Sequence, residues 1–259
     1  MSAAVGDLDL LVDAAKAAGD IARGFFKADP EVWDKEGGQG PVTEADLAVD
    51  RMLREELTRA RPYAWLSEET DDDLARLDAD EVFIVDPIDG TRAFIQGSEH
   101  WAHSLAIARG GIVDTAVVYL PVAGKLYAAQ RGQGATLNGA AISVSGREGI
   151  EGATVLASKP NFDATHWIDA KVPPVERKFR SSLAYRLSLV GEGRFDAMMT
   201  LRATWEWDVA AGSLIVEEAG GHVSDRRAGL ARYNNRDPML NGMVAASPKV
   251  HDALVARLL

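Results

Sequence analysis

The stretch Val82-Phe83-Ile84-Val85-Asp86-Pro87-Ile88-Asp89-Gly90-Thr91 carries the strongest structural and chemical signal in this sequence. Its apolar first half predicts a short buried strand that delivers Asp86 at its end. Pro87 is expected to end the hydrogen-bond ladder of this strand, because proline has no backbone N–H group. Asp89 then follows on a tight turn, where Gly90 allows the backbone to approach a ligand closely.

The two carboxylates of this stretch can converge on a single cation, since they stand three residues apart on a turn. Hard divalent ions such as Mg²⁺ prefer oxygen ligands, and the backbone carbonyl of Ile88 is well placed to complete the shell. If a short helix begins at Thr91, its free N–H groups form a site for a phosphate beside the metal ion. An Asp-x-x-Asp-Gly sequence alone is more typical of an ordinary turn, but the threonine and the apolar lead-in favour the metal site.

The composition is that of a globular protein with an excess of acid. The 259 residues include 39 Asp or Glu and 28 Lys or Arg, for a formal net charge of −11, and 47% of them are hydrophobic. The absence of cysteine from the sequence excludes disulfides, thiolate nucleophiles, iron–sulfur clusters and Cys-ligated zinc. Any metal ion must therefore be bound by oxygen or imidazole.

The same features limit the partners and the location that we expect. Eleven surplus negative charges repel nucleic-acid backbones and anionic lipids, so neither a nucleic-acid polymer nor a membrane is expected as a partner. No apolar run approaches the roughly 20 residues of a membrane span. The N-terminal residues lack the basic flank and apolar core of a signal peptide, which favours a cytoplasmic location.

Helical spacing of apolar residues predicts two N-terminal helices. The first covers residues 7–26, with Asp7 as its N-cap. The second follows a Gly-rich stretch at residues 37–41, is capped by Thr43 and ends before Pro62. Its expected apolar stripe consists of Leu47, Met52, Leu53 and Leu57.

The remaining elements change in character along the chain. They are expected as strands at 63–66 and 82–85, an antiparallel meander over 104–144, a strand near 155, a helix at 183–190, a strand at 195–199, a helix at 208–219, a strand at 243–246 and a closing helix from 248. The best division lies near residues 145–152. We therefore expect an N-terminal α+β sub-domain at 1–147 and a C-terminal α/β sub-domain at 148–259.

Three further acidic motifs are unremarkable when each is taken alone. Leu66-Ser67-Glu68-Glu69 is typical of a solvated strand end. Trp205-Glu206-Trp207-Asp208-Val209-Ala210-Ala211-Gly212 places Asp208 in a first helical turn, where it would serve as a cap or dipole partner. Pro41-Val42-Thr43-Glu44-Ala45-Asp46 indicates a capped helix start.

Taken together with the first stretch, these motifs resemble the inositol monophosphatase superfamily of metal-dependent, lithium-sensitive phosphatases. The similarity covers nearly the whole chain in the family's order, from Lys35 before the Gly-rich turn to the Glu-Ala-Gly-Gly end of the last motif helix. The Asp-Pro-Ile-Asp-Gly-Thr core is specific, whereas Val-Thr-x-x-Asp and Glu-Glu would be weak alone. The resemblance implies a layered αβαβα sandwich of mixed α+β and α/β character and a homodimer.

The resemblance also implies a site between the two sub-domains with about two to three Mg²⁺ ions. Glu68, Asp86 and the Ile88 carbonyl would hold one ion, and Asp86 would bridge to a second ion shared with Asp89 and Asp208; a third, looser ion is expected near Glu68. Thr91, hydrogen-bonded to Asp46, would with Glu68 orient and deprotonate a metal-bound water for in-line attack. The N–H groups of Gly90 and Thr91 would hold the phosphate.

Several other interpretations compete with this one. Haloacid-dehalogenase-type phosphatases use Asp-x-Asp-Gly-Thr, whereas two residues separate Asp86 from Asp89 here. His100 and His103 could form a metal pair, but ordinary surface or packed histidines are favoured. The Trp205 and Trp207 rings are more typical of interface packing than of base stacking. A non-catalytic regulatory protein on the same fold is a further alternative, which the complete set of metal ligands disfavours.

The substrate stays open at this level. Animal-type inositol monophosphatases place an acidic residue seven positions before the second-domain Asp, and Leu201 stands there in this chain. Other motifs look similar to bacterial 3′(2′),5′-bisphosphate nucleotidases, and residues 92–95 to histidinol-phosphatase-like branches. Inositol monophosphate, 3′-phosphoadenosine 5′-phosphate and histidinol phosphate are therefore all candidates. Four arginines could grip a second phosphate, although exposed arginines are more often only solvated: Arg180, Arg186, Arg194 and Arg202.

Overall fold

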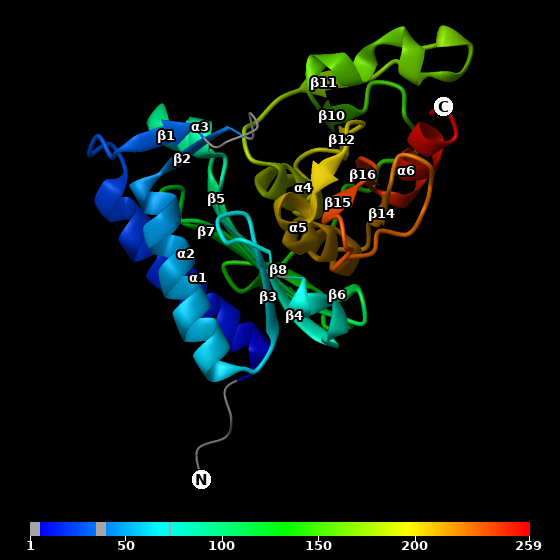
Figure 1. Ribbon diagram of the computed structural model, residues 1–259. Helices are drawn as coiled ribbons and strands as arrows, with labels where there is room; N and C mark the ends of the chain where they lie inside the picture. The colour runs from blue at the N-terminus through cyan, green and yellow to red at the C-terminus, as the bar shows by residue number, and fades with distance from the viewer. Residues whose placement is uncertain (1–5, 35–39, 73) are drawn as a thin grey trace.

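The elements of the chain stack in layers, in the order helix, sheet, helix, sheet, helix (Figure 1). The computed structural model describes residues 6–34, 40–72 and 74–259. Lys35 and most of the Gly-rich stretch at 37–41 lie outside the described residues. Among the described helices, none has both the length and the apolar character needed to cross a membrane. The layering confirms the predicted αβαβα sandwich.

The first sheet has seven strands in the order β3-β4-β5-β6-β7-β8-β9. Only β3 and β4 run parallel, and the following strands form the antiparallel meander that the sequence predicts. The strands are β3 (Ala64–Ser67), β4 (Glu81–Asp89), β5 (Ala102–Arg109), β6 (Ile112–Leu120), β7 (Lys125–Gln130), β8 (Ala135–Leu137) and β9 (Ala140–Ala141).

The second sheet has five strands in the order β11-β10-β12-β16-β14. Its strands are β10 (Thr154–Leu156), β11 (Glu176–Lys178), β12 (Ala197–Thr200), β14 (His222–Ser224) and β16 (Met243–Ala246). Two small antiparallel pairs complete the strands, β1 (Val32–Asp34) with β2 (Pro41–Thr43) and β13 (Thr204–Trp205) with β15 (Met239–Leu240). Short 3₁₀ turns include η2 (Ala75–Asp78), η3 (Lys159–Phe162), η4 (Ala164–His166) and η5 (Ile168–Ala170).

The helices fill the layers around and between the sheets (Figure 1). They are α1 (Asp7–Phe25), α2 (Glu44–Ala60), the short α3 (Thr91–Ile95), α4 (Leu183–Gly191), α5 (Glu206–Glu218) and α6 (Pro248–Val255). Alternation along β4 sorts its side chains, because successive strand residues point to opposite faces. Phe83 and Val85 pack in the cluster that holds α1 and α2, whereas Val82 and Ile84 pack in the cluster that holds α4 and α5.

The layer between the two sheets is buried on nearly all sides. Helix α5 packs over small residues of the first sheet, including Ala106 and Ala116, which belong to the same apolar cluster as Ala210 and Leu214. Helices α4 and α5 meet so closely that a Cβ atom on Gly212 would lie 2.5 Å from the Cβ atom of Leu187. A helix that is apolar all round belongs in such an interior layer.

Two local predictions about the N-terminal helices differ from the structure. Gly6, not Asp7, is the N-cap of α1, because the carboxylate of Asp7 is bound by Arg61 and Arg109 instead. Of the expected stripe of α2, Leu53 and Leu57 are buried, but Leu47 is 36% exposed and Met52 is only partly buried. The core-facing positions at this end are taken by smaller residues, including Ala45 and Val49.

Pro87 was also expected to end the ladder of β4, and this prediction is wrong. The antiparallel pairing with β5 continues past it, from Asp86 opposite Ser104 to Asp89 opposite Ala102, with a register shift in between. An irregular pairing accommodates a proline and re-aims the side chains on either side of it. The capping of α2 by Thr43 is confirmed.

Candidate active site

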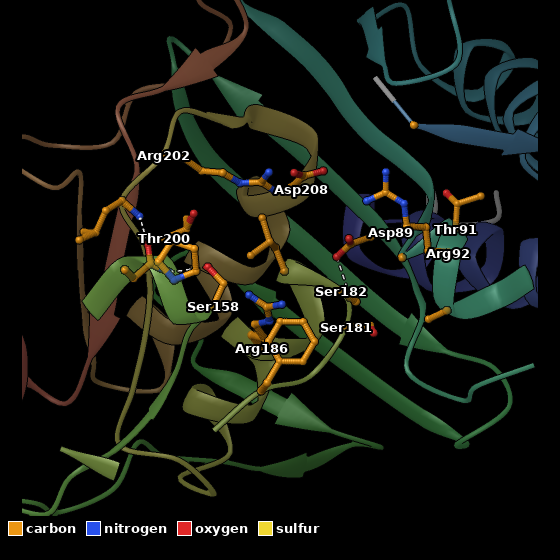
Figure 2. A pocket seen from close by; sticks show the side chains of 18 of the residues that line it. Asp89, Thr91, Arg92, Ser158, Ser181, Ser182, Arg186, Thr200, Arg202 and Asp208 are labelled. Atoms are coloured by element: carbon orange, nitrogen blue, oxygen red, sulfur yellow. Dashed lines mark hydrogen bonds between the residues drawn. The ribbon is translucent and has the colours of Figure 1, made fainter. Parts of the chain in front are cut away.

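A pocket of about 590 Å³ lies where the end of β4 faces the starts of α4 and α5. Its walls carry both acidic and basic side chains (Figure 2). The acidic residues are Glu68, Asp89 and Asp208, and the arginines are Arg92, Arg186 and Arg202. Such a volume suits a small metabolite.

Three carboxylates meet at the end of β4. Asp86, Asp89 and Asp208 each offer an oxygen atom, and these atoms all lie within 4.8 Å of one another. Asp86 is 1% exposed, and among the described residues neither of its carboxylate oxygens has a hydrogen-bond partner. Burial, followed by the charges of Glu68 and Asp89, raises the pKa of Asp86 well above its usual range. A buried carboxylate with no donor is costly, and a bound cation would compensate it.

Glu68 reaches this group because β3 runs parallel to β4. Ser67 is paired with Val85, so Glu68 follows at the level of Asp86, and its backbone N–H donates to the Val85 carbonyl at 3.2 Å. Parallel neighbours end at the same sheet edge. The acidic residues at the ends of β3 and β4 therefore lie close together in space, although they belong to separate sequence motifs.

Asp89 is bound to the start of α4. Its Oδ2 atom accepts hydrogen bonds from the Ser182 hydroxyl and from the Ala184 backbone N–H, both at 2.6 Å (Figure 2). Burial raises the pKa of Asp89 to about 6, and the Ser182 and Ala184 bonds counteract part of that rise. This link joins the two halves of the chain at the pocket. A serine before a helix is an N-cap signal, but its bond to Asp89 has no local sequence signature.

Thr91 and Asp46 lie together behind the turn at Gly90. The Thr91 hydroxyl lies 3.3 Å from Asp46 Oδ1 and 3.2 Å from the Ile88 carbonyl oxygen, and it can donate its single proton to either. Asp46 is held in place through Oδ2, which accepts from the Thr43 backbone N–H at 2.9 Å and from its hydroxyl at 2.5 Å. The structure thus contains the Thr91–Asp46 contact that the resemblance implies.

The first turn of α5 places Asp208. The Ser104 hydroxyl on β5 donates to the Trp207 carbonyl at 2.9 Å, which fixes the helix start against the first sheet. The Trp205 and Trp207 rings stack on each other, with centroids 4.7 Å apart, and both belong to the central apolar cluster. Neither tryptophan lines the pocket. This arrangement agrees with interface packing rather than base stacking.

His103 acts on the site through the backbone, which the sequence did not reveal. Its Nδ1 atom donates to the Pro87 carbonyl, since a carbonyl can only accept, and so braces the irregular part of β4. Burial lowers the pKa of His103 to about 4, which keeps the ring neutral. Among the described residues, the two groups able to hold a metal ion include neither His100 nor His103.

The four candidate arginines divide into two pairs. Arg186 and Arg202 line the pocket, whereas Arg180 and Arg194 do not. Arg194 lies 3.9 Å from Glu192 at the surface. Leu201 also lines the pocket, so the position where an acidic residue was looked for is an apolar part of the wall.

A layered αβαβα fold with converging carboxylates at a strand end defines a class of metal-dependent phosphatases. Residues 7–259 match the model of the Inositol monophosphatase family, and the chain belongs to this family. Its class as a phosphatase follows from this membership and from relatives named inositol-1-monophosphatase.

The chain is similar to proteins with two different names. It is 35% identical to Inositol-1-monophosphatase of Rhizobium meliloti (strain 1021) over 234 residues, 86% of each chain. It is 33% identical to Nus factor SuhB of Escherichia coli (strain K12) over 261 residues, 97% of this chain and 95% of the relative.

Solved structures agree with the fold. An IMPase from Thermotoga maritima superposes with a TM-score of 0.82 at 29% identity, over 96% of this chain and 95% of that one. The extragenic suppressor protein suhB from Bartonella henselae gives 0.80 at 28% identity, over 96% of both chains.

Proposed function

We propose that this chain is a magnesium-dependent phosphomonoesterase that hydrolyses a small phosphate monoester with water as the nucleophile. The observation that carries the proposal is the buried Asp86 carboxylate, which among the described residues has no hydrogen-bond donor and lies within 4.8 Å of two further carboxylates. A bound cation would compensate the charge of this buried carboxylate, which an apolar environment cannot do. The family supports the same reaction class.

The residues that would hold the metal ions are Glu68, Asp86, the Ile88 carbonyl, Asp89 and Asp208. These are all oxygen donors, which Mg²⁺ prefers. When bound, the ions supply positive charge for the phosphate and lower the pKa of water from about 15.7 toward 7. In such a site the acidic pocket no longer repels an anionic substrate.

Thr91 and Asp46 provide a route for the proton of the attacking water. The Thr91 hydroxyl can accept that proton while it donates its own to Asp46 Oδ1, 3.3 Å away. Thr91 has a second acceptor in the Ile88 carbonyl. A cation held by that carbonyl would make it a poorer acceptor, which favours Asp46 as the acceptor. Glu68, on the pocket wall, would orient the water.

Gly90 and Thr91 would hold the phosphate through their backbone N–H groups. Gly90 has a φ of +103°, which a residue with a side chain rarely adopts. A Cβ atom there would also lie 3.2 Å from the His100 carbonyl oxygen. Both constraints explain the glycine at this turn, and Gly90 also lines the pocket in which the phosphate would bind.

Inositol monophosphate and 3′-phosphoadenosine 5′-phosphate are the substrates that we propose first. The apolar Leu201 wall gives a neutral sugar ring no acidic partner there, whereas the Phe179 ring lines the pocket and is 48% exposed, which suits a flat base. Histidinol phosphate remains the alternative. We also propose lithium sensitivity and a homodimer, from the family, and a cytoplasmic location with no nucleic-acid or membrane partner, from the charge and pattern of the sequence.

The test is phosphate release from the three phosphate esters, measured side by side as kcat/KM with saturating Mg²⁺ and again with EDTA. We expect Mg²⁺-dependent release with at least one of them. Calorimetric titration of Mg²⁺ into wild-type protein and Asp86→Asn gives a readout that does not depend on turnover. Absence of both release and Mg²⁺ binding would overturn the proposal.

A non-catalytic role is the second candidate, favoured by the relatives named Nus factor SuhB. The two candidates separate cleanly because only the enzyme needs its carboxylates. The non-catalytic role is favoured if the wild type hydrolyses none of the three esters and Asp208→Asn still supports the cellular function of the protein.

A further inference from the structure

The pocket has a basic wall that the proposed hydrolysis does not use. Arg186 lies on α4 and Arg202 follows β12, so both come from the second half of the chain, whereas Asp89 and Thr91 lie on the side of β4 (Figure 2). Phosphate binding and water activation at β4 need neither guanidinium. The two arginines therefore call for an explanation of their own.

Arg186 is a buried cation without an ion pair to any described residue, although the carboxylates of Asp89 and Asp208 act on it from a longer distance. It is 8% exposed, and among the described residues no carboxylate lies within ion-pair distance of it. Its Nε atom donates to the Arg180 carbonyl at 2.5 Å, and its guanidinium carbon lies 4.4 Å from the centre of the Phe179 ring. These contacts orient the guanidinium and leave its two terminal nitrogens without a described acceptor.

Arg202 adds a second positive charge to the same wall. It forms no ion pair or side-chain hydrogen bond with any described residue, and its positive charge repels that of Arg186. Burial, helped by the charge of Arg202, lowers the pKa of Arg186 to about 10, although the charges of Asp89 and Asp208 counteract this. If metal ions neutralise Asp89 and Asp208, the like charges of Arg186 and Arg202 remain on the pocket wall, and an anion bound there would compensate them.

Packing alone explains Arg186 less well. Cation–π stacking and one bond to a backbone carbonyl would be enough to place the side chain, but an apolar residue could fill the same space without a buried charge. Packing does not explain Arg202, which is exposed on the pocket wall and forms no hydrogen bond or ion pair with a described residue. Anion binding explains both residues at once.

We propose that Arg186 and Arg202 form a subsite for a second anionic group of the substrate, a phosphate or a carboxylate beyond the ester that is cleaved. The inference rests on the proposed hydrolysis and adds the substrate class to it. Guanidinium groups bind such anions through paired N–H donors, which gives geometric selectivity as well as charge. The pocket volume of about 590 Å³ leaves room for a ligand that spans both ends.

This subsite ranks the candidate substrates. A bisphosphate places its second anion against the two arginines. A neutral inositol ring offers no charge there, and the ammonium group of histidinol phosphate would be repelled. The enzyme is therefore expected to prefer substrates with two anionic groups.

The experiment compares two pairs of substrates that differ only in the second anion. The pairs are adenosine 3′-phosphate with adenosine 3′,5′-bisphosphate, and inositol 1-phosphate with inositol 1,4-bisphosphate, at matched free Mg²⁺. We expect kcat/KM for the bisphosphate to be higher by about tenfold to a hundredfold in at least one pair, as for a charge-assisted pair of hydrogen bonds.

Variants then assign this preference to the arginines. Arg202→Gln is expected to remove most of the preference by raising KM for the bisphosphate, and Arg202→Lys should keep part of it. Arg186→Gln should act in the same way, with its melting temperature measured to check folding. Arg194→Gln, which removes an arginine outside the pocket, is the matched control.

Two results would overturn the subsite. One is equal kcat/KM within both pairs, and the other is a preference that survives Arg202→Gln. Either can occur while Mg²⁺-dependent phosphate release stands. If no ester is hydrolysed, the proposed function fails by itself, and calorimetric binding of adenosine 3′,5′-bisphosphate decides the subsite: weaker binding by Arg202→Gln supports it, and equal binding overturns it.

Discussion

The two sides of the pocket are built in different ways. The β4 side presents Asp86 and Asp89, which strand pairing positions and which the Ser182 hydrogen bond to Asp89 ties to α4. The opposite side presents Arg186, Arg202 and also Asp208, from two helices and from the segment after a strand of the second sheet. The difference indicates a division of labour, in which the carboxylates carry the chemistry and the two arginines select the substrate.

Removal of a carboxylate is expected to have the largest effect on activity. Asp89→Asn and Asp208→Asn should each lower kcat by about 10³-fold or more on every substrate, because bound metal ions contribute several kcal/mol to the transition state. Circular dichroism should show an intact fold. The loss should not depend on a second anion in the substrate, and near-wild-type rates would contradict the metal assignment.

The proton route is expected to give the next largest effect. Thr91→Ala should lower kcat by about 10²- to 10⁴-fold, the usual range for a general acid–base group, and Thr91→Ser should recover much of it. Asp46→Asn should cause a loss of similar kind. Because the two residues act as a unit, the double variant should be no worse than the poorer single one. Additive losses in steady-state kinetics would show that they act separately.

The link between the two sides gives a smaller effect. Ser182→Ala removes the 2.6 Å hydrogen bond to Asp89, and loss of a bond to a metal ligand typically weakens metal affinity by about 10- to 100-fold. We expect the Mg²⁺ dependence of kcat to shift by about tenfold. Ser181→Ala is the control, since Ser181 lines the pocket without a described bond to Asp89. Equal shifts in the two variants would contradict the role of Ser182.

The smallest expected effect concerns stability and comes from His103. Its pKa is about 4 in the folded protein against 6.5 when unperturbed, so between these values the unfolded state binds more protons. Stability is therefore retained near pH 7 and falls as the pH is lowered through 6.5. Acidification to pH 5 should cost about 2 kcal/mol from this group.

The measurement is urea unfolding at pH 7 and pH 5, with EDTA present in both buffers. His103→Gln cannot titrate, so its stability should fall less between the two pH values than that of the wild type. An equal fall in both proteins would show that the histidine is accessible to protons in the folded state.

The sequence predicted the β4 side of the site well because its signals are local. The carboxylates of Asp86 and Asp89 lie within one short motif, and the capping of α2 by Thr43 follows from neighbours along the chain. The strand, helix and meander order was confirmed for the same reason. The roles proposed for these residues in metal binding and catalysis stay predictions.

The sequence alone could not distinguish the arginines of the pocket from arginines on the ordinary surface. Four arginines were candidates, and only the path of α4 and β12 brings Arg186 and Arg202 to the pocket. The Asp89–Ser182 hydrogen bond joins residues 93 positions apart in the sequence, and the His103–Pro87 hydrogen bond joins residues 16 positions apart. Asp7 was misassigned as a cap because its partners, Arg61 and Arg109, are just as distant in sequence.

The apolar layer between the sheets has a consequence for how such a chain can be divided. That single cluster contains residues of both halves, such as Ala106 from β5 and Met198 from β12, closed over α4 and α5. A recombination break near residue 147 would leave each fragment with an open apolar face that only the other can cover. We therefore expect that neither fragment folds alone.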